Sequence, residues 1–311
     1  MRIGILDSVH PVLAERLAAA GHVVSEVSAT DRDALRFLDG LVVRSSIVYS
    51  DLLRMMPALR FLARAGAGME NIDRETCTAR GILLYSSPEG NRDGVGELCV
   101  AQLLVLMKHL ARANAQVHRG EWKREENRGH DLHGSTVGII GYGHMGGAFA
   151  DRLSGFSVRV LAHDKYKQGF GAGHVTETSL DRLLAESDAI SLHLPLNDET
   201  HHYANAAFFN GTGKPIWFLN TSRGAVVHTA ALLNAIDDGR VRGAALDVLE
   251  FEKADLSGMD PGADAATLKR LLDDERVLLT PHIAGVTHEG RFKMASALAD
   301  KILTDFPSST L

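Results

Sequence analysis

The sequence predicts an α/β fold with two doubly wound parallel sheets, and three observations support this prediction. Residues 1 to about 90 alternate short apolar runs with helical patterns. A second block of the same kind begins near Leu132. Within that block a glycine-rich turn, Gly141-Tyr-Gly-His-Met-Gly146, joins a strand-like run to a helical one. Strands that alternate with helices form parallel sheets whose faces the helices cover.

The first block contains five strand-like runs and four helical patterns between them. Glycine or proline follows three of the helical patterns, at Gly21, Pro57 and Gly81, as is typical where helices end. The predicted strands are 2–6, 23–27, 41–43, 60–63 and 82–85, and the predicted helices are 12–20, 31–37, 50–56 and 72–80.

A long helical pattern, 93–117, follows the first block. It is longer than a crossover between neighbouring strands requires, so we interpret it as a connector between two lobes. Its surplus apolar surface is available for a partner subunit. A second amphipathic pattern, 289–306, is too short to form a domain, and we expect it to return to the first lobe.

The second block contains six strand-like runs, and the residue at or just past the end of each can bind a ligand or take part in chemistry. In open parallel sheets ligands bind outside these carboxyl ends, and six strands in a doubly wound sheet fit the dinucleotide-binding fold. The runs are 135–140, 158–163, 189–194, 216–219, 243–248 and 277–280, and the residues are Gly141, Asp164, His193, Arg223, Asp247 and His282.

The glycine-rich turn predicts a site for the diphosphate of a dinucleotide. Gly141 permits the tight turn, Gly143 lets backbone N–H groups approach the diphosphate, and Gly146 lets the next helix pack on the strand. The helix N-terminus favours the negative charge. Asp164 follows Gly146 by 18 residues, about where a carboxylate meets the adenosine ribose. Its charge favours NAD over NADP, although the neighbouring Lys165 moderates this preference.

Three residue types near the strand ends suit hydride transfer at a 2-hydroxy acid. An arginine such as Arg223 can hold a carboxylate through two parallel hydrogen bonds. The histidine of Thr280-Pro281-His282 can take the hydroxyl proton. An acid beside it fixes its tautomer, but spacing does not decide among Asp247, Glu250 and Glu252. Taken singly, an arginine after a strand is equally well a structural residue, and one of 15 histidines chosen by position alone is more often structural.

Composition and charge exclude several other classes. Lysine and arginine total 33 against 39 acidic residues, so nucleic acid is not an expected partner. Cys77 and Cys99 have neither disulfide nor metal spacing, and no metal is expected. The first residues show no export signal, and the longest apolar run, 98–107, is too short to span a bilayer. We therefore expect a cytoplasmic protein with no membrane contact.

Four motifs in the same order resemble the D-isomer-specific 2-hydroxyacid dehydrogenases. Besides the glycine-rich turn, they are Asn-Thr-Ser-Arg-Gly-Ala-Val at 220–226, Ala-Leu-Asp-Val-Leu-Glu at 245–250 and Thr-Pro-His-Ile-Ala-Gly at 280–285. The resemblance implies an NAD-dependent homodimer. It also implies a Rossmann NAD-binding domain, residues 96–285, inserted in a flavodoxin-like substrate domain, residues 1–95 and 286–311.

The resemblance assigns roles to individual residues. It implies three catalytic residues, Arg223, Glu252 and His282. The residues that it places at the cofactor are Gly141, Gly143, His144, Met145, Gly146, Asp164, His193, Thr200, Thr221, Ser222, Asp247 and Gly285.

Within the family, the first lobe is most similar to the 3-phosphoglycerate dehydrogenases. The similarity lies in Val42-Val43-Arg44-Ser45-Ser46 and in the run from Arg64 to Asp73. It implies oxidation of 3-phosphoglycerate to 3-phosphohydroxypyruvate, the first step toward serine. It also implies that Arg44 and Arg64 bind the phosphate and that Ala67 and Gly68 contact the substrate. The alternative is that both arginines make structural ion pairs.

Two other functions are alternatives. One is a reductase of another 2-keto acid, such as glyoxylate or hydroxypyruvate. The other is an NAD-sensing binding protein, like the transcriptional corepressors that resemble this family. The segment 253–275 departs from the family's proline-rich pattern, and a serine-feedback domain is not expected after the tail helix.

Overall fold

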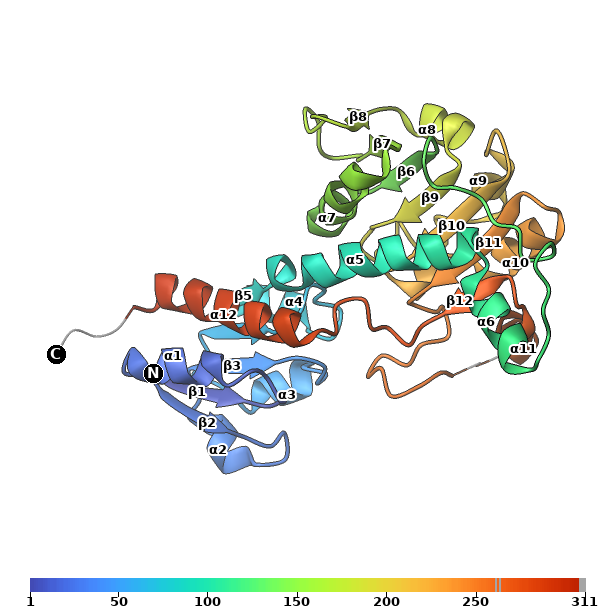
Figure 1. Ribbon diagram of the computed structural model, residues 1–311. Coiled ribbons are helices and arrows are strands. Elements are labelled where there is room, and N and C mark those ends of the chain that lie inside the picture. Colours follow the sequence, from blue (N-terminus) through green and yellow to red (C-terminus); the bar gives the residue numbers. More distant parts are fainter. Residues whose placement is uncertain (261, 263, 308–311) are drawn as a thin grey trace. The chain divides into compact units, whose positions relative to one another are not determined.

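The computed structural model describes residues 1–260, 262 and 264–307, which form two compact units (Figure 1). The first unit comprises Met1–Arg92, Ala254–Ser257 and the chain from Gly285 onward. The second comprises Asp93–Lys253 and Gly258–Ala284. Each unit contains one sheet, and all strand pairs in both sheets are parallel. The predicted fold class is therefore confirmed.

The sheet of the first unit has the strand order β2-β1-β3-β4-β5, which is the flavodoxin-like order. Each predicted strand lies within one residue of an observed one. The strands are β1 (Arg2–Ile5), β2 (Val23–Glu26), β3 (Gly40–Val43), β4 (Phe61–Arg64) and β5 (Leu83–Ser86), and the helices are α1 (Val12–Ala19), α2 (Arg32–Arg36), α3 (Ser50–Arg54), α4 (Arg74–Ala79) and α12 (His288–Asp305).

Aspartate caps explain why two helices begin later than predicted. The carboxylate of Asp31 accepts a 3.0 Å hydrogen bond from Ala34 N, and Asp73 accepts one of 2.9 Å from Thr76 N. An N-cap residue lies outside the helix that it stabilises. The helices therefore start at Arg32 and Arg74 rather than at residues 31 and 72.

Alternate side chains of a central strand are buried on opposite faces of the first sheet. Leu41 and Val43 belong to one apolar cluster, whereas Val42 belongs to the cluster on the other face. All three are fully buried. Because both faces are covered, the sequence of this strand is a continuous apolar run rather than an alternation of apolar and polar residues.

The sheet of the second unit has seven strands in the order β12-β11-β10-β9-β6-β7-β8. Counted from β6, this is the Rossmann order 3-2-1-4-5-6 with one further strand at the β12 edge. The strands are β6 (Thr136–Ile140), β7 (Arg159–His163), β8 (Val175–Glu177), β9 (Ala189–Leu192), β10 (Ile216–Asn220), β11 (Val241–Leu246) and β12 (Val277–Leu279).

The prediction of six strands in this block missed β8. That edge strand has three residues, of which only Val175 is buried, so it carries no apolar pattern. The helices between the strands are α7 (His144–Leu153), α8 (Leu180–Glu186), α9 (Ala206–Asn210), α10 (Thr229–Asp237) and α11 (Ala265–Asp273), with short 3₁₀ turns at Ser154–Phe156 and Gly224–Val226.

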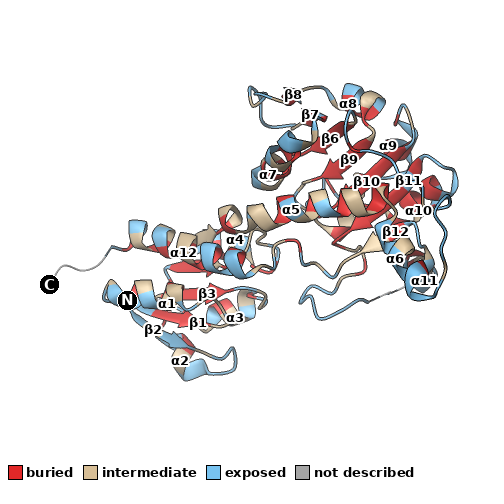
Figure 2. Cartoon of the chain, in the orientation of Figure 1, coloured by how far each residue is buried: buried red, intermediate tan, exposed pale blue. Residues whose placement is uncertain are grey.

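Apolar side chains cover both faces of the second sheet as well. Along β10, Trp217 and Leu219 belong to one cluster, and Ile216 and Phe218 belong to the other. The strands are mostly buried, whereas the helices have exposed outer sides (Figure 2). Cys77 and Cys99 are fully buried in the first and second units.

The prediction of one helix over 93–117 was wrong, because the chain forms two helices there. They are α5 (Pro88–Met107) and α6 (Leu110–His118), which are bent by 62°. His109 breaks the helix with a left-handed backbone, φ 53°. Among the described residues no single helix is long and apolar enough to cross a bilayer; only this bent pair is, by length and composition.

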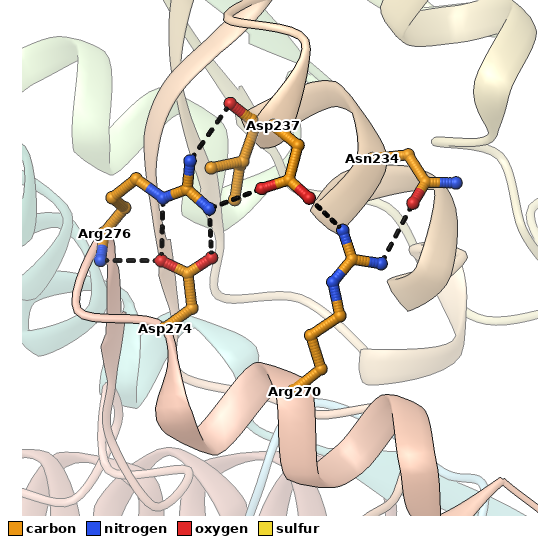
Figure 3. Close-up of polar contacts among 6 residues, drawn as sticks. Asn234, Asp237, Arg270, Asp274 and Arg276 are labelled. Carbon is orange, nitrogen blue, oxygen red and sulfur yellow. Dashed lines mark hydrogen bonds and ion pairs between the residues drawn. The ribbon is translucent and has the colours of Figure 1, made fainter.

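The segment 253–275, which departs from the family pattern, contains α11. Asp264 caps this helix through Thr267 N at 3.1 Å. Two arginines join α11 and the start of β12 to α10 (Figure 3). Arg270 and Arg276 both contact Asp237 at 2.6 Å, and Arg276 also pairs with Asp274 at 2.7 Å. Residues 261 and 263 lie outside the described part of the chain.

Candidate active site

The glycine-rich turn after β6 leaves no room for side chains at two of its glycines. Gly141 has φ 91°, and a Cβ there would lie 2.4 Å from the carbonyl oxygen of His193. A Cβ on Gly146 would lie 2.1 Å from the carbonyl oxygen of Gly141. The turn is therefore tight, and α7 packs directly on the end of β6.

The same turn fits the diphosphate of a dinucleotide. Gly143 and His144, at the start of α7, are exposed, and nothing lies within 4 Å of where a Cβ of Gly143 would stand. Met145, the next residue, is half-buried and packs against the core. The first N–H groups of a helix have no partner within the helix and attract anions. The residues present can thus bind a diphosphate through the backbone.

Asp164 follows β7 and is held by three backbone N–H groups. Its Oδ2 accepts from Tyr142 at 2.8 Å, and its Oδ1 accepts from Tyr166 at 2.9 Å and Lys167 at 3.0 Å. Burial by itself raises the pKa of Asp164, but these donors outweigh burial, and the pKa lies below its usual value of 3.8. The side chain is therefore a carboxylate at neutral pH, as a ribose-binding acid requires.

His193, past the end of β9, is a neutral imidazole. Burial lowers the pKa of His193 to about 4. Its Nε2 lies 2.9 Å from Ser191 Oγ, and its buried Nδ1 has no hydrogen-bond partner among the described residues. Thr200 lies in the next turn, where its hydroxyl donates to the carbonyl of Pro195 at 2.6 Å. A buried ring nitrogen without a partner is unusual, and it marks this strand end as a candidate contact for a ligand.

Asn220 shapes the loop that carries Arg223. Its Oδ1 accepts from Ser222 N at 3.0 Å and from Ser222 Oγ at 2.7 Å, and its Nδ2 donates to Arg223 O at 2.9 Å. Thr221 lies between them, with its hydroxyl 3.4 Å from Cys99 Sγ. Arg223 is half-buried, and its Nη1 donates to Ser222 O at 2.6 Å. The loop is thus fixed by its own side chains.

A buried carboxylate fixes the turn after β12. Asp247 is fully buried, and it accepts hydrogen bonds from Thr280 Oγ1 at 2.6 Å, Ile283 N at 2.9 Å and Ala284 N at 2.8 Å. Its own carbonyl accepts from His282 N at 2.7 Å. His282 has φ 54°, a conformation that non-glycine residues adopt only when their surroundings impose it.

The acid beside His282 is Glu252. Its Oε2 lies 3.1 Å from His282 Nδ1, and both side chains are partly exposed, at 20% and 31%. Neither alternative acid occupies this position. Asp247 binds the backbone of the turn, and Glu250 contacts His202 at 2.5 Å. The structure therefore assembles a carboxylate–imidazole pair with the other ring nitrogen, Nε2, left for chemistry.

The residues predicted to bind substrate lie in the first unit. Arg44 follows β3 and is exposed. Arg64 ends β4, and its guanidinium donates to Arg44 O at 3.0 Å and to the carbonyl of Gly68. Ala67 lies in the loop that the latter contact closes. Arg64 therefore has a structural role in shaping this loop.

Asp7 occupies the backbone N–H groups next to Arg44. It accepts from the N–H groups of Arg44 at 2.6 Å, Ser45 at 3.0 Å and Ser46 at 3.0 Å.

Gly285, predicted to contact the cofactor, also belongs to the first unit, where a Cβ would lie 2.4 Å from Asn91 Nδ2.

The contacts of several residues that organise the site were not predicted from the sequence. Asn220 follows a known signal, because an asparagine two residues before a serine often forms such a turn. The roles of Thr280, His202 and Glu250 had no local signal, since their partners are distant in the sequence. No group of three or more potential metal ligands occurs among the described residues.

Comparison with known proteins identifies the class. Residues 100–284 match the family model described as D-isomer specific 2-hydroxyacid dehydrogenase, NAD binding domain. The match spans more than half of the chain, so the protein belongs to the D-isomer-specific 2-hydroxyacid dehydrogenase family. The matched model is the NAD-binding domain of that family.

Several members are similar along most of the chain. A D-3-phosphoglycerate dehydrogenase from Bacillus subtilis is 33% identical over 90% of this chain, which spans about half (52%) of that protein. A hydroxypyruvate reductase from Thermotoga maritima is 33% identical over 86% of this chain and 85% of its own length. The structure of a D-lactate dehydrogenase from Aquifex aeolicus, complexed with NAD and lactic acid, is 28% identical. It covers 98% of this chain and 95% of its own, with a TM-score of 0.82.

Proposed function

We propose that Arg223, Glu252 and His282 carry out the interconversion of a D-2-hydroxy acid and its 2-keto acid. The observation that supports this proposal is the 3.1 Å contact between Glu252 and His282 Nδ1. With Nδ1–H donated to the carboxylate, the neutral ring presents the lone pair of Nε2, which accepts the substrate hydroxyl proton. Glu252 then stabilises the resulting imidazolium.

Arg223 and the cofactor account for the rest of the reaction. Arg223 binds the substrate carboxylate and orients carbon 2. NAD, when bound, accepts the hydride that leaves carbon 2. The turn after β6, Asp164 and the neutral His193 are the residues that would hold this cofactor. In the reverse direction His282 returns the proton to the carbonyl oxygen.

As substrate we propose 3-phosphoglycerate, oxidised to 3-phosphohydroxypyruvate on the way to serine. Arg44 follows β3 and Arg64 ends the neighbouring parallel strand β4, so both arginines lie at one edge of the first sheet. We propose this unit as the substrate domain and the second unit as the NAD-binding domain. Because Arg64 already binds two carbonyl groups, Arg44 is the residue proposed to contact the phosphate, and Arg64 supports its backbone.

One observation favours the reductase of an unphosphorylated keto acid as a second candidate. The carboxylate of Asp7 already occupies three backbone N–H groups at residues 44–46, and its negative charge would repel a phosphate dianion there. The substrate of the Thermotoga relative, hydroxypyruvate, has no phosphate.

One set of initial-rate measurements distinguishes the two candidate functions. NAD reduction at mildly alkaline pH is measured with 3-phosphoglycerate, D-glycerate and D-lactate, and NADH oxidation with hydroxypyruvate and glyoxylate. A clear preference for the phosphorylated acid supports the first candidate. Activity confined to unphosphorylated acids contradicts it and supports the second.

We also propose a homodimer, with the region of α6 in the contact. Leu110 and Val117 of this helix are 51% and 53% exposed, and Trp122 just beyond it is 78% exposed. Large apolar side chains clustered along one element mark an interaction surface. Light scattering after gel filtration should give twice the mass of the 33.6 kDa chain. A monomer at micromolar concentration would contradict this proposal.

A further inference from the structure

The carboxylate of Glu250 connects three segments of the second unit. Its Oε1 lies 2.5 Å from Nε2 of His202, in the loop between β9 and α9. Its Oε2 accepts a 2.9 Å hydrogen bond from the N–H of Thr229, the first residue of α10. Glu250 and His202 are only 24% and 31% exposed as side chains. We call these three residues, Glu250, His202 and Thr229, the carboxylate clasp.

The clasp lies next to two of the residues that we propose as catalytic. Glu250 precedes Glu252 by two residues. Arg223 directly precedes Gly224, and a Cβ on Gly224 would lie 1.9 Å from the carbonyl oxygen of Leu249. The backbone beside Glu250 therefore packs directly on the loop of Arg223. Because these two backbone segments are in direct contact, a shift of the segment of Glu250 must move the loop of Arg223.

His202 holds its place through both its backbone and its side chain. Its N–H donates to Ala225 O at 2.8 Å, and Ala204 N donates to Val226 O at 3.0 Å, so this loop runs along the segment that follows Arg223. His202 has φ 52°, a left-handed conformation that glycine adopts more readily. A non-glycine residue at this φ indicates that its side chain is needed here. The contact that the His202 side chain supplies is the one with Glu250.

The chemistry of the clasp suits an ionised carboxylate. Burial raises the pKa of Glu250, but the hydrogen bonds from Thr229 and the contact with His202 outweigh it, so the pKa lies below its usual value of 4.5. Two further rings pack around His202. The ring centroids of His201 and His228 lie 3.9 Å and 4.7 Å away, and His228 Nδ1 accepts from Ala231 N at 3.1 Å. These contacts limit how far the His202 ring can move.

We propose that Glu250 is a positioning residue, which through His202 and Thr229 holds the loops of Arg223 and Glu252 in the arrangement needed for catalysis. It touches neither the substrate nor the reacting atoms. The inference rests on the proposed roles of Arg223 and Glu252. Small displacements of orienting groups lower turnover steeply.

Two single variants and their combination test the clasp. Glu250→Gln keeps an oxygen for Thr229 but removes the charged acceptor facing His202. His202→Gly adopts φ 52° without strain and removes the imidazole. Each should lower kcat about 10- to 50-fold on the best substrate of the series above, because the catalytic loops lose their shared anchor. The double variant should be no slower than the slower single variant, since both remove the same contact.

Three further readouts separate positioning from general damage. The Kd for NADH, measured by fluorescence quenching, and the thermal midpoint should change little in all three variants. Free imidazole should restore part of kcat in His202→Gly but not in the double variant. The matched control is Glu186→Gln, which removes a partly exposed carboxylate paired with Arg159 and Arg182 in the same unit and should leave kcat unchanged.

Unchanged kcat in both single variants would overturn the inference, and so would losses that multiply in the double variant or a failure of imidazole rescue. If Glu250→Gln does not fold, His202→Gly and its rescue still decide the question. Arg223→Gln distinguishes a failure of the proposed function from a failure of the positioning role. A wild-type rate in that variant would refute the proposed function, whereas a slow Arg223→Gln with fast clasp variants refutes the positioning role alone.

Discussion

The buried carboxylate of Asp247 and the hydroxyl of Thr280 are joined by a 2.6 Å hydrogen bond, which connects the end of β11 to the turn carrying His282. The same carboxylate accepts two backbone N–H groups of that turn. Asp247→Asn replaces one accepting oxygen by a donor that faces other donors. We expect a loss of about 3 kcal/mol in the free energy of unfolding, measured with urea. Asp238→Asn, at an exposed position, is the control. If both variants lowered the free energy of unfolding equally little, the role of Asp247 in fixing this turn would be contradicted.

His282→Asn should lower kcat by at least about two orders of magnitude, because asparagine cannot accept the hydroxyl proton. The Kd for NADH should stay within a factor of about two, since the proposed cofactor residues are untouched. Stopped-flow measurement of a single turnover checks that the chemical step is the one that slows. A variant with the wild-type rate would remove His282 from the mechanism.

Arg44→Gln should lower kcat/KM for 3-phosphoglycerate by about 10- to 150-fold, which is the loss of one charge-assisted contact of 1.5 to 3 kcal/mol. Rates on D-glycerate should not change. Arg64→Gln serves as the comparison, because its loss of two carbonyl contacts should lower activity on both substrates and the thermal midpoint. Equal losses on both substrates in Arg44→Gln would refute the phosphate site.

Asp164→Ser should weaken NAD binding about tenfold or more and reduce the preference for NAD over NADP. The wild-type carboxylate accepts ribose hydroxyls and repels a 2′-phosphate, whereas serine has no charge. Calorimetric titration with both nucleotides measures this directly. Asp181→Ser, at an exposed position of α8, is the control. An unchanged ratio of the two Kd values would show that Asp164 does not select the cofactor.

The contribution of Asp7 to stability should disappear in acid. Burial raises its pKa, but the hydroxyl of Ser46 and the N–H groups of residues 44–46 outweigh burial and hold the pKa below 3.8. A carboxyl whose pKa is lower in the folded state stabilises that state above its unfolded pKa, and the effect is lost as pH falls through the folded pKa. Asp7→Asn should therefore be less stable at pH 7 by about 1.5 kcal/mol or more.

The difference between wild type and Asp7→Asn should shrink as the pH falls below about 4. Urea unfolding between pH 3 and 7 measures it. The exposed Asp33→Asn should show no such pH-dependent difference. A difference that is constant over this range would mean that the hydrogen bonds to Asp7 do not depend on its charge.

Local patterns sufficed for most of the fold. Every predicted strand of the first unit lies within one residue of the observed one. The inner strands β1, β3 and β4 are mostly buried, and buried parallel strands are continuous apolar runs. The glycine-rich turn after β6 was also predicted from the sequence, because only glycine fits at Gly141 and Gly146. Patterns failed where the signal is short, as for the three residues of β8.

The sequence by itself determined the two parallel sheets, the dinucleotide turn and the set of residues at the strand ends. Tertiary structure alone decided how side chains distant in the chain combine. It breaks the long helix at His109, joins Arg64 to the carbonyls of Arg44 and Gly68, and separates Glu250 from Glu252 although both follow β11. The reason is physical, since propensity and periodicity act between neighbours, whereas these contacts depend on how strand ends and turns meet in space.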